Sequence, residues 1–297
     1  MTYYCLCMSP AIDANVKLAT APRGDGEIFK NVIVEENPGG KTINVARYLA
    51  LRGAGAVHCL GLLGEDNAAL FEREFSSFSI IDKMTRVRGA TRRNEMITWP
   101  GGAFKLNQPA FPGLDFDEDA FLDRLLSDVA ENDEITVIIS GSLPGCCSAL
   151  FYAKAVAAFK RRGAFVVLDA SGEAMVRALE EKPDLIKPNA EECEALVGFV
   201  PKTPDEFKKA TALLKTKAEH VIISDGASGA WFDVEFFAAP KVNAVDTTAA
   251  GDTLLAEYCY SRNPALAVAA GSAAVEKPGS NAPEICRVKE LAAYETF

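Results

Sequence analysis

Short apolar runs rich in β-branched residues alternate with helical patterns along the second half of the chain. Apolar residues recur at helical spacing within 204–218, and a second helical pattern, 148–162, ends at Gly163. Strands that alternate with helices in this way predict βαβ units around a mainly parallel sheet. The strands predicted in this half are 135–140, 164–169, 184–187 and 220–224.

The first half of the chain adds two predicted strands, 3–8 and 57–63, and a helix over 41–51 that ends before Gly53. Nothing in the sequence reads as a linker between domains, so we expect a single domain over 1–297.

Two polar segments, 17–37 and 86–107, interrupt the alternation of strands and helices. Both contain short alternating stretches, NVIVEE and EMITW, which are typical of antiparallel strands with one solvent-facing side. We expect the two segments to form one small β lid, and long surface loops are the alternative. Exposed strand edges tend to be covered, so the lid is also where a second copy of the chain could pair to give a homodimer.

Composition excludes several classes of protein. Hydrophobic residues make up 49% and charged residues 24% of the 297 residues, as in an ordinary globular protein. No apolar run approaches the roughly 18 residues that span a bilayer, so we expect a cytoplasmic protein with no membrane partner. The net charge of −10 disfavours nucleic acid, but a small phosphorylated ligand can still bind through local donors.

Cysteine and histidine usage excludes two further kinds of site. The eight cysteines include no CxxC pair and the chain has only two histidines, so the usual zinc frameworks cannot be assembled. A serine hydrolase is disfavoured because no G-x-S-x-G elbow is present.

The segment VDTTAAGDTLLAEYCYS, residues 245–261, carries the most specific chemistry. Small residues lead into a helix that begins near Gly251, so the N–H groups of Ala249, Ala250 and Gly251 can face an anion at the positive end of the helix dipole. Asp252 would repel that anion unless it takes a proton from an attacking hydroxyl, which indicates a catalytic base. An ordinary turn with an acidic residue that complements the dipole is the alternative.

The segment ENPGGKTINVARYLALRG, residues 36–53, places Gly39 and Gly40 before a helix. The glycines let backbone approach a ligand closely, and Lys41 and Asn44 project donors from one face of the first turn. This surface suits hydroxyls and phosphate. The spacing matches neither a P-loop nor a dinucleotide-binding fingerprint.

Together the two segments resemble the signatures of the ribokinase and PfkB carbohydrate kinase family, over nearly the whole chain. Other strings are similar to the branch that acts on phosphorylated ketohexoses: 10–13, 91–94, 140–144, 168–173 and 187–192. The resemblance implies an α/β fold, a three-layer α/β/α ribokinase-like sandwich with a mainly parallel central sheet and a small β lid.

The resemblance also implies a role for each matching position. Asp252 is similar to the base of the family and the amides of 249–251 to its anion hole. The positions similar to those that hold the sugar are Asp13, Gly39, Gly40, Lys41 and Asn44, with Lys41 and Arg92 as partners of a phosphate already on the sugar. The positions similar to those on the ATP side are Lys187, Asn189, Ser224, Asp225, Gly226, Ala227, Ser228, Gly229 and Asn281, with Glu192 as the residue that would organise Mg²⁺.

Three positions depart from the family pattern. Thr42 replaces a usual glycine and would crowd the sugar or add a hydroxyl contact. Ala249 also replaces a usual glycine, and alanine would cost about 1 kcal/mol if that position needed φ > 0. Ser9 replaces a usual asparagine.

The resemblance implies an ATP-dependent kinase of a phosphorylated ketohexose, of the fructose 1-phosphate or tagatose 6-phosphate type. A kinase of an unphosphorylated sugar or a nucleoside is one alternative. A catalytically weak relative that binds sugar or nucleotide is another.

Overall fold

The computed structural model describes residues 1–24, 26–30, 32–130 and 134–293. Residues 25 and 31 of the first predicted lid segment, and 294–297 of the predicted domain, lie outside the described residues.

Nine described strands form the main sheet in the order β13-β12-β11-β10-β9-β8-β1-β4-β5. All pairs from β11 to β5 are parallel, and β12 and β13 add an antiparallel edge. The strands are β1 (Thr2–Cys7), β4 (Ala56–Gly64), β5 (Ile81–Val87), β8 (Ile135–Ser140), β9 (Phe165–Asp169), β10 (Leu185–Ile186), β11 (His220–Ser224), β12 (Gly229–Phe232) and β13 (Glu235–Ala238).

Helices cover both faces of the main sheet because its central strands are apolar on both sides. In β1, Leu6 packs into the hydrophobic cluster of one face, and Cys5 and Cys7 pack into the cluster of the other. One face carries α3 (Glu118–Asp128), α4 (Phe151–Arg161), α5 (Gly172–Ala178), α6 (Cys193–Val197) and α7 (Pro204–Leu214). The other carries α1 (Lys41–Leu51), α2 (Ala69–Ser77), α8 (Ala250–Ser261), α9 (Pro264–Ala274) and α10 (Ile285–Ala293). The predicted three-layer α/β/α sandwich is therefore confirmed.

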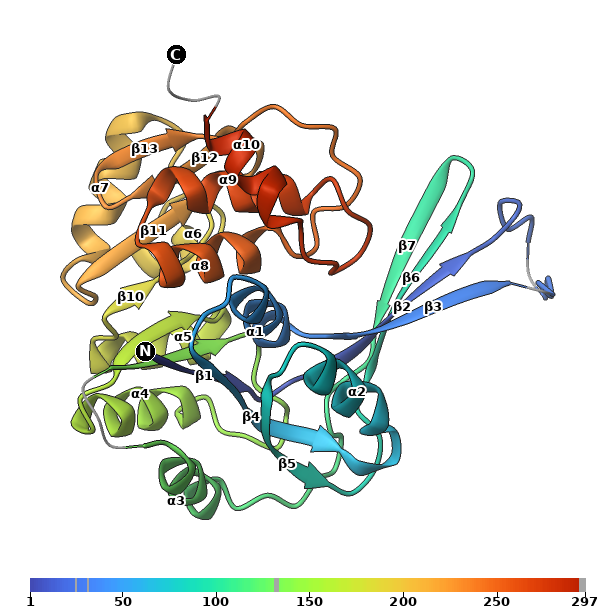
Figure 1. The fold of residues 1–297 in the computed structure, drawn as a ribbon, viewed down its shortest axis with the longest axis horizontal. Coiled ribbons are helices and arrows are strands. Elements are labelled where there is room, and N and C mark those ends of the chain that lie inside the picture. The colour runs from blue at the N-terminus through green and yellow to red at the C-terminus, as the bar shows by residue number, and fades with distance from the viewer. Residues whose placement is uncertain (25, 31, 131–133, 294–297) are drawn as a thin grey trace.

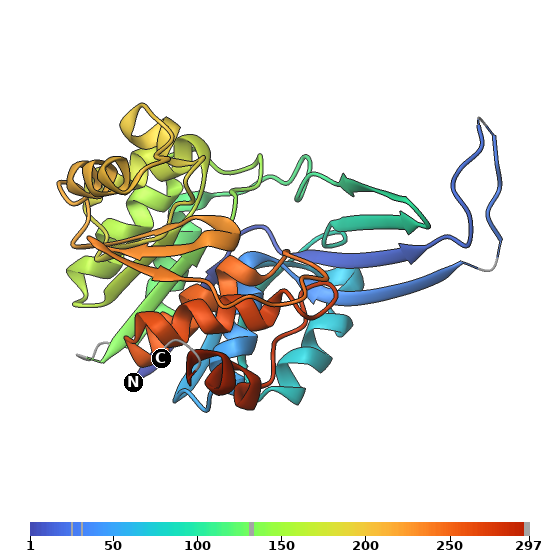
Figure 2. The ribbon, with the colours of Figure 1, turned by 90° about the horizontal axis from the view of Figure 1, so that it is seen from above.

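A second sheet of four described strands extends from the body of the protein (Figures 1 and 2). Its order is β3-β2-β6-β7, from the strands β2 (Ala11–Lys17), β3 (Ile33–Gly39), β6 (Arg93–Trp99) and β7 (Gly102–Asn107). We call it the small sheet. The two hairpins meet where β2 pairs with β6, and that pair is parallel, so the expectation of antiparallel strands holds within each hairpin but not between them. The first predicted lid segment, 17–37, also began too late, because β2 starts at Ala11. The hairpins β2–β3 and β6–β7 pair through β2 and β6, and the alternation of apolar and polar residues within one segment cannot specify which strands of two hairpins pair.

Other sequence predictions can be compared with the structure directly. The helix predicted over 41–51 is α1, and the strand predicted over 135–140 is β8. All eight cysteines are free. Among the described residues, no helix has both the length and the apolar character needed to cross a membrane.

Candidate active site

The N-terminus of α8 lies beside the N-terminus of α1, and the two helices contact each other along their length. Asp252 is in the first turn of α8, and only 4% of its surface is exposed. Its Oδ2 accepts a hydrogen bond from Nδ2 of Asn44 at 2.8 Å. Burial raises the pKa of Asp252 to about 7, and the nearby charge of Asp169 adds to this effect, while Lys41, Asn44 and Lys187 oppose it. A carboxyl group in this state can hold or release a proton near neutral pH.

Two lysines converge on Asp169, which ends β9 and is fully buried. Nζ of Lys41 lies 3.4 Å from both carboxylate oxygens, and Nζ of Lys187 lies 3.3 Å from Oδ1. Burial alone would raise the pKa of Asp169, but the two lysines outweigh it and lower the pKa. This aspartate therefore stays ionised and holds two cations close to Asp252.

The anion hole predicted before α8 is partly available. The N–H groups of Ala249 and Gly251 have no hydrogen-bond acceptor among the described residues, whereas Ala250 donates weakly to Thr247 O at 3.4 Å. A Cβ atom at Gly251 would lie 3.3 Å from Nζ of Lys187. The small residue at 251 thus lets the lysine approach the positive end of the helix, where an anion would meet both.

Asp13 lies in β2 of the small sheet, across the strand pair from Asn94. Its Oδ1 accepts from Nδ2 of Asn94 at 3.1 Å, and its Oδ2 accepts from the hydroxyl of Ser280 at 3.3 Å. A Cβ atom at Gly39 would lie 2.1 Å from Oδ2 of Asp13, so this carboxylate position requires glycine at 39. Burial raises the pKa of Asp13.

The Asp13 side chain lines a pocket of about 190 Å³ between the small sheet and the body. The other lining residues are mostly polar: Ala14, Asn15, Asn94, Glu95, Met96, Lys105, Asn107, Asp246, Thr248, Gly279 and Ser280. Such a lining suits the hydroxyl groups of a sugar.

Arg92 lies where the second segment of the small sheet leaves the body. Within the described ranges its guanidinium makes only long contacts, 3.2 to 3.4 Å, with the carbonyls of Ser9, Pro10 and Gln108. Burial lowers the pKa of Arg92. The geometry leaves its donors weakly occupied and able to turn to a stronger acceptor.

The residues predicted for the nucleotide side come from the ends of β10 and β11. Asn189 pairs with Ser224 in a parallel bridge, so the segment after β10 lies against the turn over 224–229. Glu192 and Asn189 bind each other: the N–H of Asn189 donates to Oε2 of Glu192 at 2.9 Å, and the N–H of Glu192 donates to Oδ1 of Asn189 at 2.7 Å. Only glycine fits at position 229, because a Cβ atom there would lie 2.1 Å from the carbonyl oxygen of Phe237.

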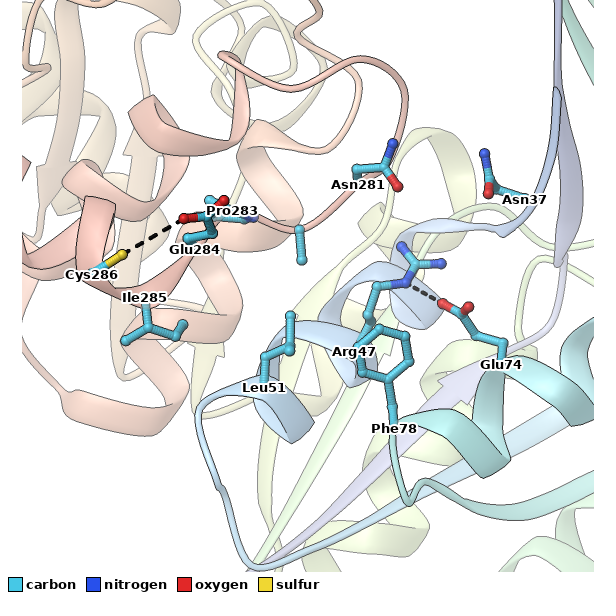
Figure 3. Close-up of a pocket in the computed structure, with 11 residues that line it drawn as sticks. Asn37, Arg47, Leu51, Glu74, Phe78, Asn281, Pro283, Glu284, Ile285 and Cys286 are labelled. Carbon is cyan, nitrogen blue, oxygen red and sulfur yellow. Dashed lines mark hydrogen bonds and ion pairs between the residues drawn. The ribbon is translucent and has the colours of Figure 1, made fainter.

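Asn281 lies elsewhere in the structure. Its Nδ2 donates to the carbonyl of Pro278 at 2.8 Å, and it lines a cavity of about 510 Å³ with Arg47, Glu74 and others (Figure 3). Among the described contacts, none joins Asn281 to the turn over 224–229.

Two of the three departures from the family pattern have structural explanations. Thr42 is fully buried, and its hydroxyl lies 2.7 Å from Ser140 O and 3.0 Å from Leu6 O. Of the two expected effects, it therefore adds a hydroxyl contact, made within the protein, and a side chain with no exposed surface does not crowd the sugar. Ala249 has φ of −106°, so alanine brings no left-handed strain. Ser9 accepts from Arg92 at 3.4 Å through its backbone carbonyl, so this contact does not explain the serine side chain.

The structure also adds residues to which the sequence analysis gave no role. Asp169 is the most prominent, since it holds both lysines. Its position at the end of a buried apolar strand, AFVVLD, was a usable signal because carboxyl ends of parallel strands carry sites. Ser280, which contacts Asp13, gave no such signal, because its partner is 267 residues away.

Comparison with known proteins gives consistent results. A family model described as "pfkB family carbohydrate kinase" matches residues 10–285. The chain is 32% identical over 270 residues to a 1-phosphofructokinase of Rhodobacter capsulatus, covering 88% of this chain and 84% of that protein. It is 35% identical over 230 residues to a 1-phosphofructokinase of Vibrio cholerae, covering 74% and 71%.

Solved structures show the same fold. Phosphofructokinase-2 from Escherichia coli, in complex with substrates and products, superposes with a TM-score of 0.87 at 24% identity, covering 99% of each chain. A ribokinase from Thermotoga maritima superposes with a TM-score of 0.75 at 20% identity, also covering 99% of each.

Proposed function

The chain belongs to the pfkB family of carbohydrate kinases, and on this premise we propose that it transfers the γ-phosphate of ATP to a hydroxyl of a phosphorylated ketohexose. The acceptor would be of the fructose 1-phosphate or tagatose 6-phosphate type, because relatives more than 30% identical over most of the chain are named 1-phosphofructokinase. The observation that carries the proposal is the buried carboxyl group of Asp252, placed beside free backbone donors and two lysines.

Asp252 acts as the general base in this proposal. Its carboxylate takes the proton from the attacking hydroxyl while the oxygen bonds to phosphorus and the bond to ADP breaks. Negative charge on the transferred group meets the N–H groups of Ala249 and Gly251 and the ammonium of Lys187, which are already oriented. No reorganisation is then needed as the charge develops.

The sugar lies in the pocket that contains Asp13, between the small sheet and the body. Asp13 and Asn44 accept and donate hydrogen bonds to its hydroxyls, and Gly39 and Gly40 give it room. Lys41 is 40% exposed, and with Arg92 it binds the phosphate that the sugar already carries. Closure of the small sheet as a lid excludes water, which would otherwise compete for the γ-phosphate.

The nucleotide occupies the other half of the edge, along Lys187, Asn189 and the turn over 224–229. Mg²⁺ fits this side through Glu192, because Oε1 of its carboxylate has no hydrogen-bond partner among the described residues. Mg²⁺ is usually held by one or two carboxylates together with phosphates and water, so one protein carboxylate is enough on this side. When bound, the ion neutralises charge on the phosphates.

The experiment that tests the base is the substitution Asp252→Asn. Loss of general-base assistance lowers kcat by roughly 10² to 10⁴-fold. ATP affinity, measured by calorimetry, stays within about twofold in this proposal, because Asp252 touches the acceptor side. Asp233→Asn is the matched control, since that carboxylate pairs with Lys215 away from the site. Full activity of Asp252→Asn would remove the proposed mechanism.

The acceptor is tested by ADP release over fructose 1-phosphate, fructose 6-phosphate, tagatose 6-phosphate, ribose and adenosine. We expect the phosphorylated ketohexoses to be favoured. Arg92→Gln should raise KM for a sugar phosphate by at least about tenfold, because a charge-assisted hydrogen bond is lost. An equal effect on ribose would contradict the role of Arg92 as a phosphate partner.

We also propose a homodimer through the small sheet. Cross-strand pairs place Val16 with Val34, Val16 with Ile97, and Ile97 with Phe104, so these four apolar side chains share one face. Val34 and Phe104 are 44% and 42% exposed. The opposite face carries Asp13 and lines the pocket, so a second copy can cover the apolar face without blocking the sugar.

A further inference from the structure

Arg47 is a buried arginine one helical turn after Asn44 in α1, and the proposed mechanism gives it no role. It is 5% exposed, and Figure 3 shows it meeting Glu74 of α2 in the wall of the 510 Å³ cavity. Nε of Arg47 forms an ion pair with Glu74. Nη2 donates to the carbonyl of Pro38 at 2.7 Å, and Nη1 donates to the carbonyl of Ser280 at 2.7 Å. These partners fix the plane of the guanidinium.

The same guanidinium also orients the side-chain amide of Asn44. Nη1 of Arg47 lies 3.2 Å from Oδ1 of Asn44, and on the other side of the amide Nδ2 donates to Asp252 at 2.8 Å. An asparagine amide has one accepting end and one donating end. Because Arg47 can only donate, it selects the orientation in which the NH₂ group faces the carboxylate.

We propose that Arg47 is a positioning residue, which acts through Asn44 to hold the Asp252 carboxylate in its ionised, correctly directed form. The proposal rests on the proposed role of Asp252 as the base. Without Arg47 the amide is free to rotate and to present its oxygen to the carboxylate, which repels the charge.

Arg47 also joins this network to the sugar side. The carbonyl of Ser280 accepts from Arg47, and the hydroxyl of the same residue donates to Asp13. Pro38, the other carbonyl partner, directly precedes Gly39 in β3. One guanidinium therefore ties the base, through Asn44, to the two segments that position Asp13.

The charges that face Asp252 are those of Asp169 from β9, Lys41 from α1 and Lys187 after β10. None of them contacts Arg47, so a substitution at 47 leaves these charges in place. A change in the titration of Asp252 would then report the orientation of Asn44.

The experiment is a titration of Asp252 by ¹³C NMR in aspartate-labelled protein, with the resonance assigned by its loss in Asp252→Asn. In Arg47→Met we expect the pKa of Asp252 to rise by about 1, the effect of losing an oriented donor to a charged group. The ionised fraction at pH 7 then falls about fivefold, so kcat falls about fivefold at pH 7 and recovers at pH 9. Arg47→Lys, which keeps the charge without the planar fork, should show the same direction.

A double-mutant cycle separates this role from a structural one. Asn44→Ala raises the pKa of Asp252 by itself, and in that background Arg47→Met should have no further effect on it. Arg52→Met is the matched control, because Arg52 pairs with Glu257 near the end of the same helix and has no contact with Asn44. It should lower stability without changing the titration.

An unchanged pKa of Asp252 in the Arg47 variants, or a shift that persists in the Asn44→Ala background, overturns the proposal. If Arg47→Met does not fold, Arg47→Lys gives the same readouts. The NMR titration does not depend on turnover. Full activity of Asp252→Asn would therefore refute the proposed base, while the titration would still decide whether Arg47 controls that carboxyl group.

Discussion

Asp252 combines a charge-bearing side chain with nearly complete burial, and this combination has a cost in stability. Burial holds the pKa of its carboxyl group at about 7, against 3.8 for the unperturbed group. A carboxyl whose pKa rises on folding binds its proton more tightly in the folded state. The contribution of this group to the free energy of unfolding is therefore complete below pH 3.8. It decreases as the pH rises and is lost above about pH 7.

Asp252→Asn should therefore stabilise the protein, and increasingly so as the pH rises. Asparagine is neutral at every pH and its amide oxygen can still accept from Asn44. Between pH 5 and pH 8 we expect the difference in unfolding free energy between Asp252→Asn and the original protein to grow by about 2 to 3 kcal/mol. The reason is that, over the two pH units from pH 5 to about 7, the carboxyl group is ionised in the unfolded chain but still protonated in the folded protein. Urea unfolding at both pH values measures this, and an advantage that shrinks with pH would contradict the raised pKa.

At the level of single residues, the sequence was informative where chemistry is local. Asp252 and Asn44 were both predicted for the site from their own segments, and the structure brings them to 2.8 Å. Asp169 received no role, because its importance comes from two lysines that lie far away in sequence. The strain that alanine would bring at 249 if φ were positive does not arise, because φ there is −106°.

Helix α1 is anchored to the sheet by one side chain in its first turn. The Thr42 hydroxyl lies between carbonyls near the ends of two adjacent strands, Leu6 in β1 and Ser140 in β8. This contact fixes the end of the helix that carries Lys41 and Asn44. A glycine at this position would leave the carbonyls without that donor.

Thr42→Val keeps the shape of the side chain but removes the hydrogen bond. We expect the free energy of unfolding to fall by about 1 to 3 kcal/mol, because buried acceptors lose their donor. Thr42→Ser, which keeps the hydroxyl, is the control and should lose less. Equal stability of the valine variant and the original protein in urea unfolding would show that the hydroxyl is not anchoring the helix.

At the level of elements, the spacing of apolar residues and the residues that end helices predicted α1, β8 and β11 well. These segments have a strong pattern of apolar residues. The edge strands β12 and β13, of four residues each, were not predicted. The parallel pairing of β2 with β6 was also missed. Pairing between segments about 80 residues apart depends on the folded body, not on local alternation.

At the scale of the whole molecule, two copies that associate through the apolar face of the small sheet have to overcome charge repulsion, because each chain has a net charge of −10. Phe104 and Leu106 are 42% and 49% exposed on that face. The double substitution Phe104→Glu and Leu106→Glu should convert the proposed dimer to a monomer in analytical ultracentrifugation. Val234→Glu is the control, because Val234 is 62% exposed and lies outside the small sheet. A dimer that survives the double substitution would refute the proposed interface.

The strands of the small sheet carry two surfaces on one backbone: in β2, Asp13 and Asn15 line the pocket, whereas Val16 shares the other face with Val34 and Ile97. Substitutions at alternate positions can therefore change ligand choice and self-association separately. Inserting one residue before Asp13 would exchange the two faces along the rest of β2, so we expect the proposed dimer and the proposed kinase activity to be lost together. Insertions and deletions in β2 should therefore be tolerated only in steps of two residues. This requirement limits how the sequence of this segment can change during evolution.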